Sequence, residues 1–204
     1  GNANWTAAWL RDVEMALQVA QDGPPAMPRR EMTLDPSLDE ARSWGQQWAL
    51  AGHPPLAVDI ETPDKSTSED ENELAQGTAA GTIYRVGLAY RHLQTTHALS
   101  VPWGSGYTDA IRGLLVDAPI ALVWNRHFDV PRLRVHGVTA PVWHDVQELW
   151  HVLHSDLPKK LEFVAPFLVP AQPYWKDQAQ QRPAYYNAID AVLTAEGSAV
   201  LWDE

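Results

Sequence analysis

The sequence predicts one α/β domain in which a mixed sheet of about five strands is flanked by helices. Short apolar runs that are rich in β-branched residues recur between turn residues, which is typical of buried strands. Stretches with apolar residues three and four apart alternate with these runs and indicate amphipathic helices. A length of 204 residues with 45% hydrophobic content suits a single core of substantial size.

Two helices are expected before the first buried strand. Apolar side chains in residues 5–20 lie at spacings of three and four and predict an N-terminal helix. Residues 32–34 are expected to be either a linker or an edge strand. A second helix should begin near Ser37, because Ser37 and Glu40 have the spacing of a capping box, and Gly52 is well placed to end it.

Residues 56–62 (LAVDIET) organise the rest of the chain. This apolar run between turn residues predicts a buried strand. Side chains alternate along a strand, so Asp59 and Glu61 should point the same way. Two acids side by side at the end of a buried strand are unfavourable unless a cation lies between them, and hard divalent cations prefer carboxylate oxygens. The alternative is a strand end at which both acids simply meet solvent.

Further strands and helices follow. Residues 83–90 and 96–103 predict two antiparallel strands, because only a short polar link joins them. A short helix is expected over residues 109–116 with Thr108 as its cap. Residues 120–124 are fully apolar and predict a strand that is buried on both faces.

The last third of the chain is expected to be largely helical. Pro131 should kink or restart the first of these helices. Residues 142–143 predict a short strand, and Asp145 is interpreted as the cap of a helix that runs to Leu153 rather than as a ligand. The other expected helices span residues 128–135, 161–168 and 184–201.

Two further groups of residues stand where a metal site would need them. Asn125, Phe128 and Asp129 share one face of a helical first turn that directly follows a buried strand, which is where open α/β sheets tend to place ligands. Tyr186 and Asp190 are four residues apart in the last helix, so the phenol and the carboxylate lie on one helix face. Taken singly, Asn125 could be a helix cap, Asp129 a first-turn acid and Tyr186 a core residue.

The ordered set Asp59-x-Glu61, Asn125-x-x-Phe128-Asp129 and Tyr186-x-x-x-Asp190 resembles the three motifs of the DEDDy 3′–5′ exonucleases. This group includes the proofreading domains of family A DNA polymerases and the ribonuclease D type enzymes. Residues 144–161 are also similar to the proofreading domains of phage-type family A polymerases. Tyr185 stands where the histidine variant of the group has its histidine, so that branch is disfavoured.

The resemblance implies a ribonuclease H-like fold and a metal-dependent 3′–5′ exonuclease. Such an enzyme hydrolyses the terminal phosphodiester of single-stranded DNA 3′ ends and releases nucleoside monophosphates. For this chain the resemblance implies a role in proofreading. Two divalent ions, Mg²⁺ or Mn²⁺, are implied as cofactors. Asp59 would bridge both ions, and Tyr186 would orient the attacking water. The implied metal ligands are Asp59, Glu61, Asp129 and Asp190, which form the catalytic set with Tyr186, and the implied substrate contacts are Thr62, Asn125 and Phe128.

Two alternatives stay open. One is a ribonuclease D-like RNA exonuclease, because the motifs contact phosphate and sugar more than base edges. The other is a catalytically silent exonuclease-like scaffold that binds nucleic acid. The partners implied are a single-stranded DNA 3′ end, or RNA, and a polymerase domain in the same or another chain. We divide the chain into an N-terminal helix with its linker (1–31) and the exonuclease domain (32–204).

Composition bounds these hypotheses. The net charge of -11 is unusual for a general nucleic-acid binder, which normally carries a basic surface. The chain has no cysteine, no apolar run long enough to span a bilayer and no N-terminal signal pattern. We therefore expect a cytoplasmic protein without a membrane partner, and the resemblance to phage-type exonucleases implies a bacterial or phage-infected cell. The acidic stretch at residues 64–73 is expected to be an exposed, mobile loop.

Overall fold

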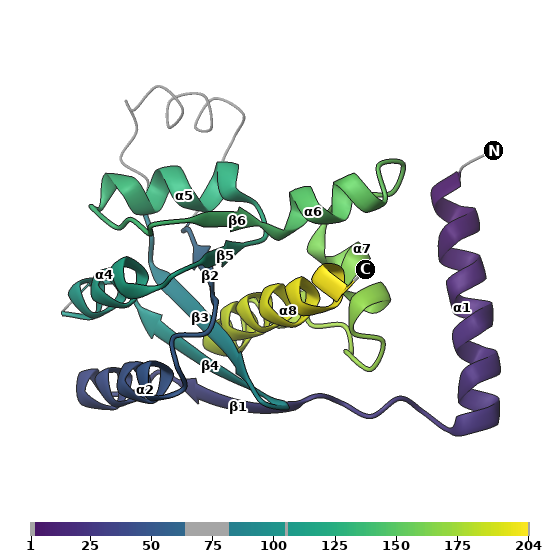
Figure 1. Cartoon of the computed structure of the whole chain (residues 1–204), viewed down its shortest axis with the longest axis horizontal. Helices are drawn as coiled ribbons and strands as arrows, with labels where there is room; N and C mark the ends of the chain where they lie inside the picture. The colour runs from purple at the N-terminus through teal and green to yellow at the C-terminus, as the bar shows by residue number, and fades with distance from the viewer. Residues whose placement is uncertain (1–2, 64–81, 105, 204) are drawn as a thin grey trace.

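A computed structural model describes residues 3–63, 82–104 and 106–203 of the chain (Figure 1). The strands are β1 (Arg29–Leu34), β2 (Leu56–Glu61), β3 (Arg85–His92), β4 (Thr95–Pro102), β5 (Ala121–Val123) and β6 (Trp143–Asp145). They form one sheet in the order β1-β4-β3-β2-β5-β6. β3 is antiparallel to β2 and β4, whereas the pairs β1–β4, β2–β5 and β5–β6 are parallel.

The mixed α/β prediction is confirmed, and the described residues form a six-stranded sheet where about five strands were expected. The additional strand is β1, because residues 32–34 belong to an edge strand and not to a linker. β1 pairs with β4 along its whole length, from Arg29 opposite Thr95 to Leu34 opposite Ser100. The expected antiparallel pair is β3 and β4. The acidic stretch at residues 64–73 lies outside the described residues.

Within the described residues, each helix expected from the sequence is present close to its expected position. They are α1 (Ala3–Asp22), α2 (Leu38–Leu50), α4 (Tyr107–Asp117), α5 (Arg126–Val135), α6 (Val146–Leu153), α7 (Leu161–Leu168) and α8 (Pro183–Asp203), with a short 3₁₀ helix, η1 (Lys176–Gln178). The capping box of α2 is present, since Ser37 Oγ accepts from the Glu40 N–H and Glu40 Oε2 accepts from the Ser37 N–H.

One local expectation was wrong. The cap of α4 is Gly106, whose φ of +87° favours glycine, and Thr108 lies inside the helix. The Thr108 hydroxyl instead accepts from the N–H of Gly104 at 3.1 Å. Of the two outcomes expected at Pro131, a kink or a restart of the helix, the restart does not occur, because α5 continues through Pro131 as one element.

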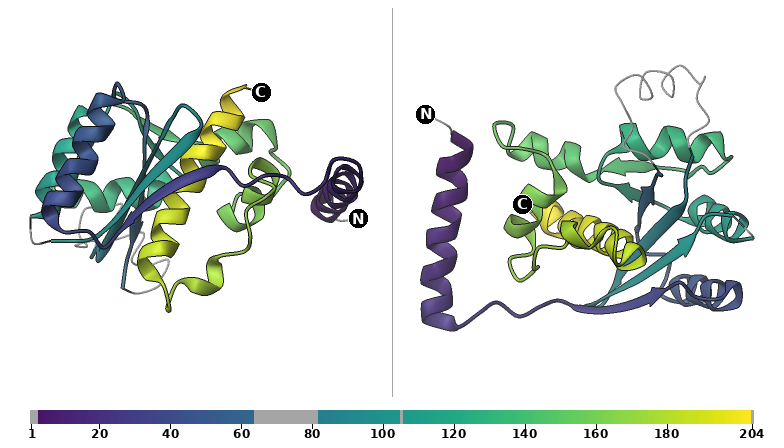
Figure 2. Two further views of the ribbon diagram at one scale, coloured as in Figure 1. Left: turned by 90° about the horizontal axis from the view of Figure 1, so that it is seen from below. Right: turned by 180° about the vertical axis from the view of Figure 1, so that it is seen from behind.

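The sheet separates two apolar layers. Figures 1 and 2 show α2 and α4 against one face and α8 across the other. Alternate residues of β2 divide between these layers: Val58 belongs to the core cluster that includes Trp44 and Trp48 of α2, whereas Ala57 belongs to the cluster that includes residues of α8. Because Asp59 and Glu61 continue the alternation of Ala57, their side chains lie on the α8 side of the sheet.

Helix α1 stands away from the sheet, beside the α7 end of the molecule (Figures 1 and 2). The predicted helix is confirmed, but its apolar stripe is not buried: Trp9 and Leu17 are 63% and 59% exposed. Arg11 of α1 contacts α7, because its guanidinium lies over the ring of Phe167, 4.8 Å from the ring centre. No helix in the described ranges combines the length and apolar character needed to cross a bilayer.

Candidate active site

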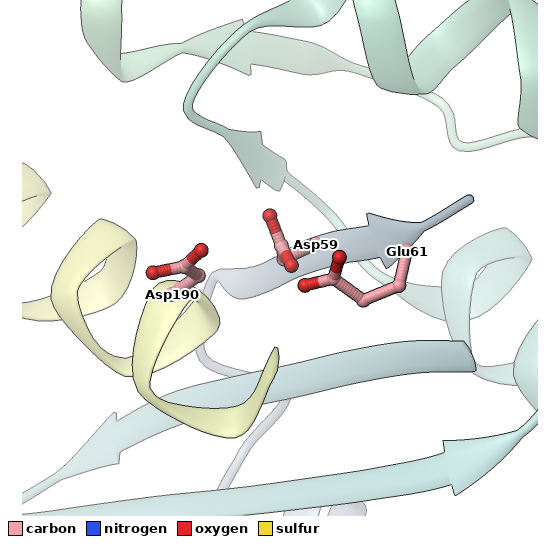
Figure 3. A group of neighbouring side chains, drawn as sticks. All are labelled: Asp59, Glu61 and Asp190. Carbon is pink, nitrogen blue, oxygen red and sulfur yellow. The ribbon is translucent and has the colours of Figure 1, made fainter. Parts of the chain in front are cut away.

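Three carboxylates from two distant segments converge at the end of β2. Asp59 and Glu61 come from the strand, and Asp190 comes from α8, which crosses the sheet at this point (Figure 3). One carboxylate oxygen from each residue lies within 4.8 Å of those of the other two. The strand alternation predicted for Asp59 and Glu61 is therefore present, and the fold adds an acid that is 129 residues or more away along the chain.

Asp129 approaches the same place from α5 and is only 5% exposed. Its carboxylate accepts a hydrogen bond from the backbone N–H of Ile60, between the two acids of β2. The start of α5 is held by Asp145, whose Oδ2 accepts from the N–H of Arg126 and whose Oδ1 accepts from the N–H of Gln147, both at 2.9 Å. Asp145 is thus confirmed as the cap of α6, and it also anchors the helix that carries Asp129.

A cavity of about 370 Å³ lies over these acids. All eight residues singled out in the sequence line it: Asp59, Glu61, Thr62, Asn125, Phe128, Asp129, Tyr186 and Asp190. Other residues that line it include Trp124, Gln147, Lys160 and Lys176. The three motifs are therefore brought to one concave site.

The acids are buried close to one another, and their pKa values rise. Burial raises the pKa of Asp59 well above its usual range, and the charges of Asp190, Glu61 and Asp129 raise it further. Burial, followed by the charge of Asp190, raises the pKa of Glu61 from 4.5 to about 7. Burial also raises the pKa of Asp129, although the N–H of Ile60 opposes this. The fully ionised cluster is therefore unfavourable unless positive charge enters it.

Lys176 and Trp175 contact Asp190, and sequence reasoning missed both. Lys176 Nζ lies 2.7 Å from Asp190 Oδ2 and donates to the Tyr186 hydroxyl at 2.9 Å. Trp175 Nε1 donates to Asp190 Oδ1 at 2.6 Å. Both residues lie where the chain enters η1, and no motif or periodicity marks them, because their role depends on how this segment docks against α8.

Asn187 is a second residue that the sequence did not reveal. Its side chain is fully buried, and its Nδ2 donates to Asp59 Oδ2 at 2.8 Å and to the Asp59 main-chain oxygen at 3.2 Å. Its Oδ1 accepts from the Ser100 hydroxyl at 2.7 Å. One signal was available: Gly87 lies inside a strand, which suggests a close backbone approach, and the Asn187 backbone does approach it.

The three expected substrate contacts occupy different parts of the cavity wall. Asn125 is at the N-cap position of α5, but its side chain makes no capping hydrogen bond, so the helix-cap interpretation of its side chain is not supported. Phe128 is half-buried and packs partly against the core. The guanidinium of Arg132 lies over its ring, 3.7 Å from the ring centre. Thr62 lies just past the end of β2.

No protein-family model matches the chain, and no curated protein is similar to it in sequence. Solved structures do share its fold. A structure described as the apo form of a nuclease has a TM-score of 0.56 at 16% identity, covering 88% of this chain and 82% of that one. The RNase domain of the yeast Pop2 protein has a TM-score of 0.57 at 8% identity, covering 88% and 90%. Escherichia coli RNase D, an exoribonuclease, has a TM-score of 0.54 at 16% identity, covering 86% of this chain and 44% of that one.

These likenesses establish the fold class. The chain is an α/β domain of the ribonuclease H-like type found in these nucleases, as the three motifs predicted.

Proposed function

We propose that this chain is a divalent-metal-dependent 3′–5′ exonuclease that hydrolyses the terminal phosphodiester of a single strand and releases nucleoside monophosphates. One observation carries the proposal. The residues of three separate motifs line a single cavity, and three of the four acids bring carboxylate oxygens within 4.8 Å of one another. Nuclease neighbours with the same fold support it.

The donor set fits divalent metal ions. Its ligand atoms are carboxylate oxygens, which hard cations such as Mg²⁺ and Mn²⁺ prefer. Burial and the neighbouring carboxylates raise the pKa of Asp59 and Glu61, so added positive charge would favour their ionised forms. Asp59, Glu61 and Asp190 would hold one ion, and Asp129 with Asp59 would hold a second. When bound, such ions supply an activated water and neutralise charge on the leaving oxygen.

Tyr186 is suited to orienting water by hydrogen bonding. Burial and the charge of Asp190 raise the pKa of Tyr186 above its ordinary value of 10.0, so the phenol keeps its proton at neutral pH. Because the hydroxyl oxygen accepts from Lys176 Nζ at 2.9 Å, the phenolic proton is directed toward another acceptor. That acceptor would be Asp190 or a water molecule in the cavity.

Residues of the cavity wall are placed to contact the 3′ end of a nucleic-acid strand. The ring of Phe128 would stack on the terminal base, and the Asn125 amide would contact the terminal nucleotide through its polar atoms. Lys160 lines the same cavity with a largely exposed side chain and would contact a phosphate. Because the chain carries a net charge of -11, we expect weak binding that weakens further with salt.

Two classes of substrate are candidates, single-stranded DNA and RNA. The similarity of residues 144–161 to phage-type polymerase exonucleases supports single-stranded DNA and a proofreading role, with residues 32–204 as the exonuclease domain and a polymerase domain as partner. The second candidate is an RNA exonuclease, because the neighbours include ribonucleases by name. A silent scaffold is disfavoured, since a binding module has no need for mutually repelling buried acids.

Matched DNA and RNA single strands with a 5′ label would test the proposal. With Mg²⁺ or Mn²⁺, we expect a ladder that shortens one nucleotide at a time from the 3′ end, and Asp59→Asn should abolish it because this residue would contact both ions. Faster shortening of the DNA strand would support proofreading, and faster shortening of the RNA strand the second candidate. Internal cuts, release of the 5′ label first, or binding without any cleavage would contradict the exonuclease assignment.

A further inference from the structure

Lys176 lies inside the acidic cluster. Its Nζ is 2.7 Å from Asp190 Oδ2 and 2.9 Å from the Tyr186 hydroxyl, and it sits 4.7 Å from the centre of the Tyr186 ring. The side chain is only 18% exposed. Trp175, the residue before it, donates to the other oxygen of Asp190. Two consecutive residues therefore occupy both oxygens of an acid that belongs to the candidate metal cluster.

The positive charge of Lys176 acts on the whole cluster. It lowers the pKa of Asp59 and of Glu61, in opposition to their burial and mutual repulsion. Burial disfavours the charged ammonium, but the contacts with Asp190 and Tyr186 outweigh this and raise the pKa of Lys176. The ammonium thus stands where a cation is needed, on the carboxylate that a metal ion would also bind.

A metal ion and this ammonium compete for the same oxygen. Metal–carboxylate bonds are short, about 2.0–2.1 Å for Mg²⁺, so an ion on Asp190 Oδ2 would lie close to Nζ. Two positive charges at such a distance repel each other strongly in a buried site. The lysine must then move away from Asp190 or reduce the affinity of the cluster for the ion.

We propose that Lys176 is an internal counter-cation: it holds Asp190 and Tyr186 in position while no metal is bound, and it lowers the affinity of the Asp59–Glu61–Asp190 cluster for divalent ions. Lys176 is thus a positioning residue, and no contact with substrate is required of it. This inference rests on the proposed function, because it needs a cation site at these acids. It predicts that loss of the lysine charge strengthens metal binding, whereas structural damage to the site would weaken it.

Mn²⁺ binding to the full chain tests the inference, with free Mn²⁺ followed by electron paramagnetic resonance at about pH 8, above the ordinary pKa of every carboxylate. Lys176→Met removes the charge, and Lys176→Gln removes it while keeping a donor for Asp190 and Tyr186. We expect both variants to bind Mn²⁺ at least about tenfold more tightly than the unaltered chain, which corresponds to about 1.4 kcal/mol.

Two control variants are needed: one keeps a positive charge at position 176, and the other removes a lysine charge outside the cavity. Lys176→Arg retains the positive charge and should leave the Mn²⁺ dissociation constant within about threefold of the original. Lys159→Met removes the same charge from an exposed lysine that does not line the cavity, and it should leave the dissociation constant within about twofold. Without metal, Lys176→Met should also unfold at a lower temperature, and added Mn²⁺ should raise its Tm by more than it raises that of the unaltered chain.

The outcomes separate this inference from the proposed function. If the unaltered chain binds Mn²⁺ and the folded Lys176→Gln variant binds it equally or more weakly, then Lys176 does not compete with the metal ion for Asp190. The metal site itself stands in that case. If neither protein binds Mn²⁺, the cation site itself is wrong and both proposals fall. Tighter binding by Lys176→Gln together with unchanged binding by Lys159→Met supports the inference.

Discussion

The side-chain amide of Asn187 in α8 donates two hydrogen bonds to Asp59 of β2, one to the carboxylate Oδ2 at 2.8 Å and one to the main-chain oxygen at 3.2 Å. The same amide accepts from the Ser100 hydroxyl of β4, which in turn accepts from Arg85 of β3. This chain of hydrogen bonds links three strands to α8, so the helix that carries Asp190 is fixed relative to the strand that carries Asp59. The distance between the two acids therefore depends on a residue that is neither a catalytic acid nor a candidate metal ligand.

Replacing Asn187 by alanine should lower stability. The substitution removes the acceptor of the buried Ser100 O–H and the amide that donates to the Asp59 carboxylate, and we expect the free energy of unfolding to fall by about 2–3 kcal/mol. Urea unfolding of the metal-free chain measures this. Gln181→Ala removes an exposed amide just before α8 and should change the value by less than about 0.5 kcal/mol. Equal effects of the two substitutions would contradict the role given to Asn187.

Gly87 should tolerate no side chain, because α8 lies against its backbone. An added Cβ would lie 2.6 Å from the main-chain oxygen of Asn187, which cannot yield unless the helix shifts. Gly87→Ala should therefore destabilise the chain by about 2–3 kcal/mol. Gly113→Ala in α4 meets nothing within 4 Å and should stabilise the chain by about 0.5–1 kcal/mol. Thermal unfolding of both variants tests the pair, and a neutral Gly87→Ala would show that α8 can move.

The metal-free chain should lose stability as pH rises. The pKa of Glu61 is about 7 in the folded chain against an ordinary 4.5, so between these values the folded state binds more protons than the unfolded state. The free energy of unfolding then falls with rising pH across this window, by up to about 3 kcal/mol from Glu61. Urea unfolding without metal at about pH 5 and about pH 8 measures the decline.

The Glu61→Gln variant shows whether this residue is responsible. Glutamine cannot ionise, so the decline between the two pH values should become smaller. A saturating divalent ion should also reduce the decline in the unaltered chain, because the ion binds the ionised carboxylates. A decline that Glu61→Gln leaves unchanged would mean that other groups control the pH dependence.

Much of the site could be predicted from local rules. Strand alternation places Asp59 and Glu61 on one face, and helix spacing places Tyr186 and Asp190 on one face, so each pair follows from its own segment. The convergence of the pairs with Asp129 is not local, and the order and spacing of the motifs predicted it only through the resemblance. The described geometry brings all of them to one cavity.

Residues whose partners come from distant segments could not be predicted. Lys176 contacts Asp190 only because η1 docks beside α8, and Asn187 contacts Asp59 only because α8 crosses β2 and β3. Neither relationship leaves a periodic pattern in the sequence. The edge strand β1 was left undecided for the same reason, because its partner β4 is distant in the chain, as is Glu196 of α8, with which the guanidinium of Arg30 pairs.

The central claim, that acids from three motifs hold divalent ions in one cavity, is tested most directly by diffraction from crystals of the chain grown with Mn²⁺. An anomalous difference map recorded near the manganese absorption edge should show a peak bound by Asp59, Glu61 and Asp190, with Asp129 beside it. Peaks only at other acidic residues, or none in this cavity from crystals whose protein degrades a 3′ end in Mn²⁺, would contradict the account.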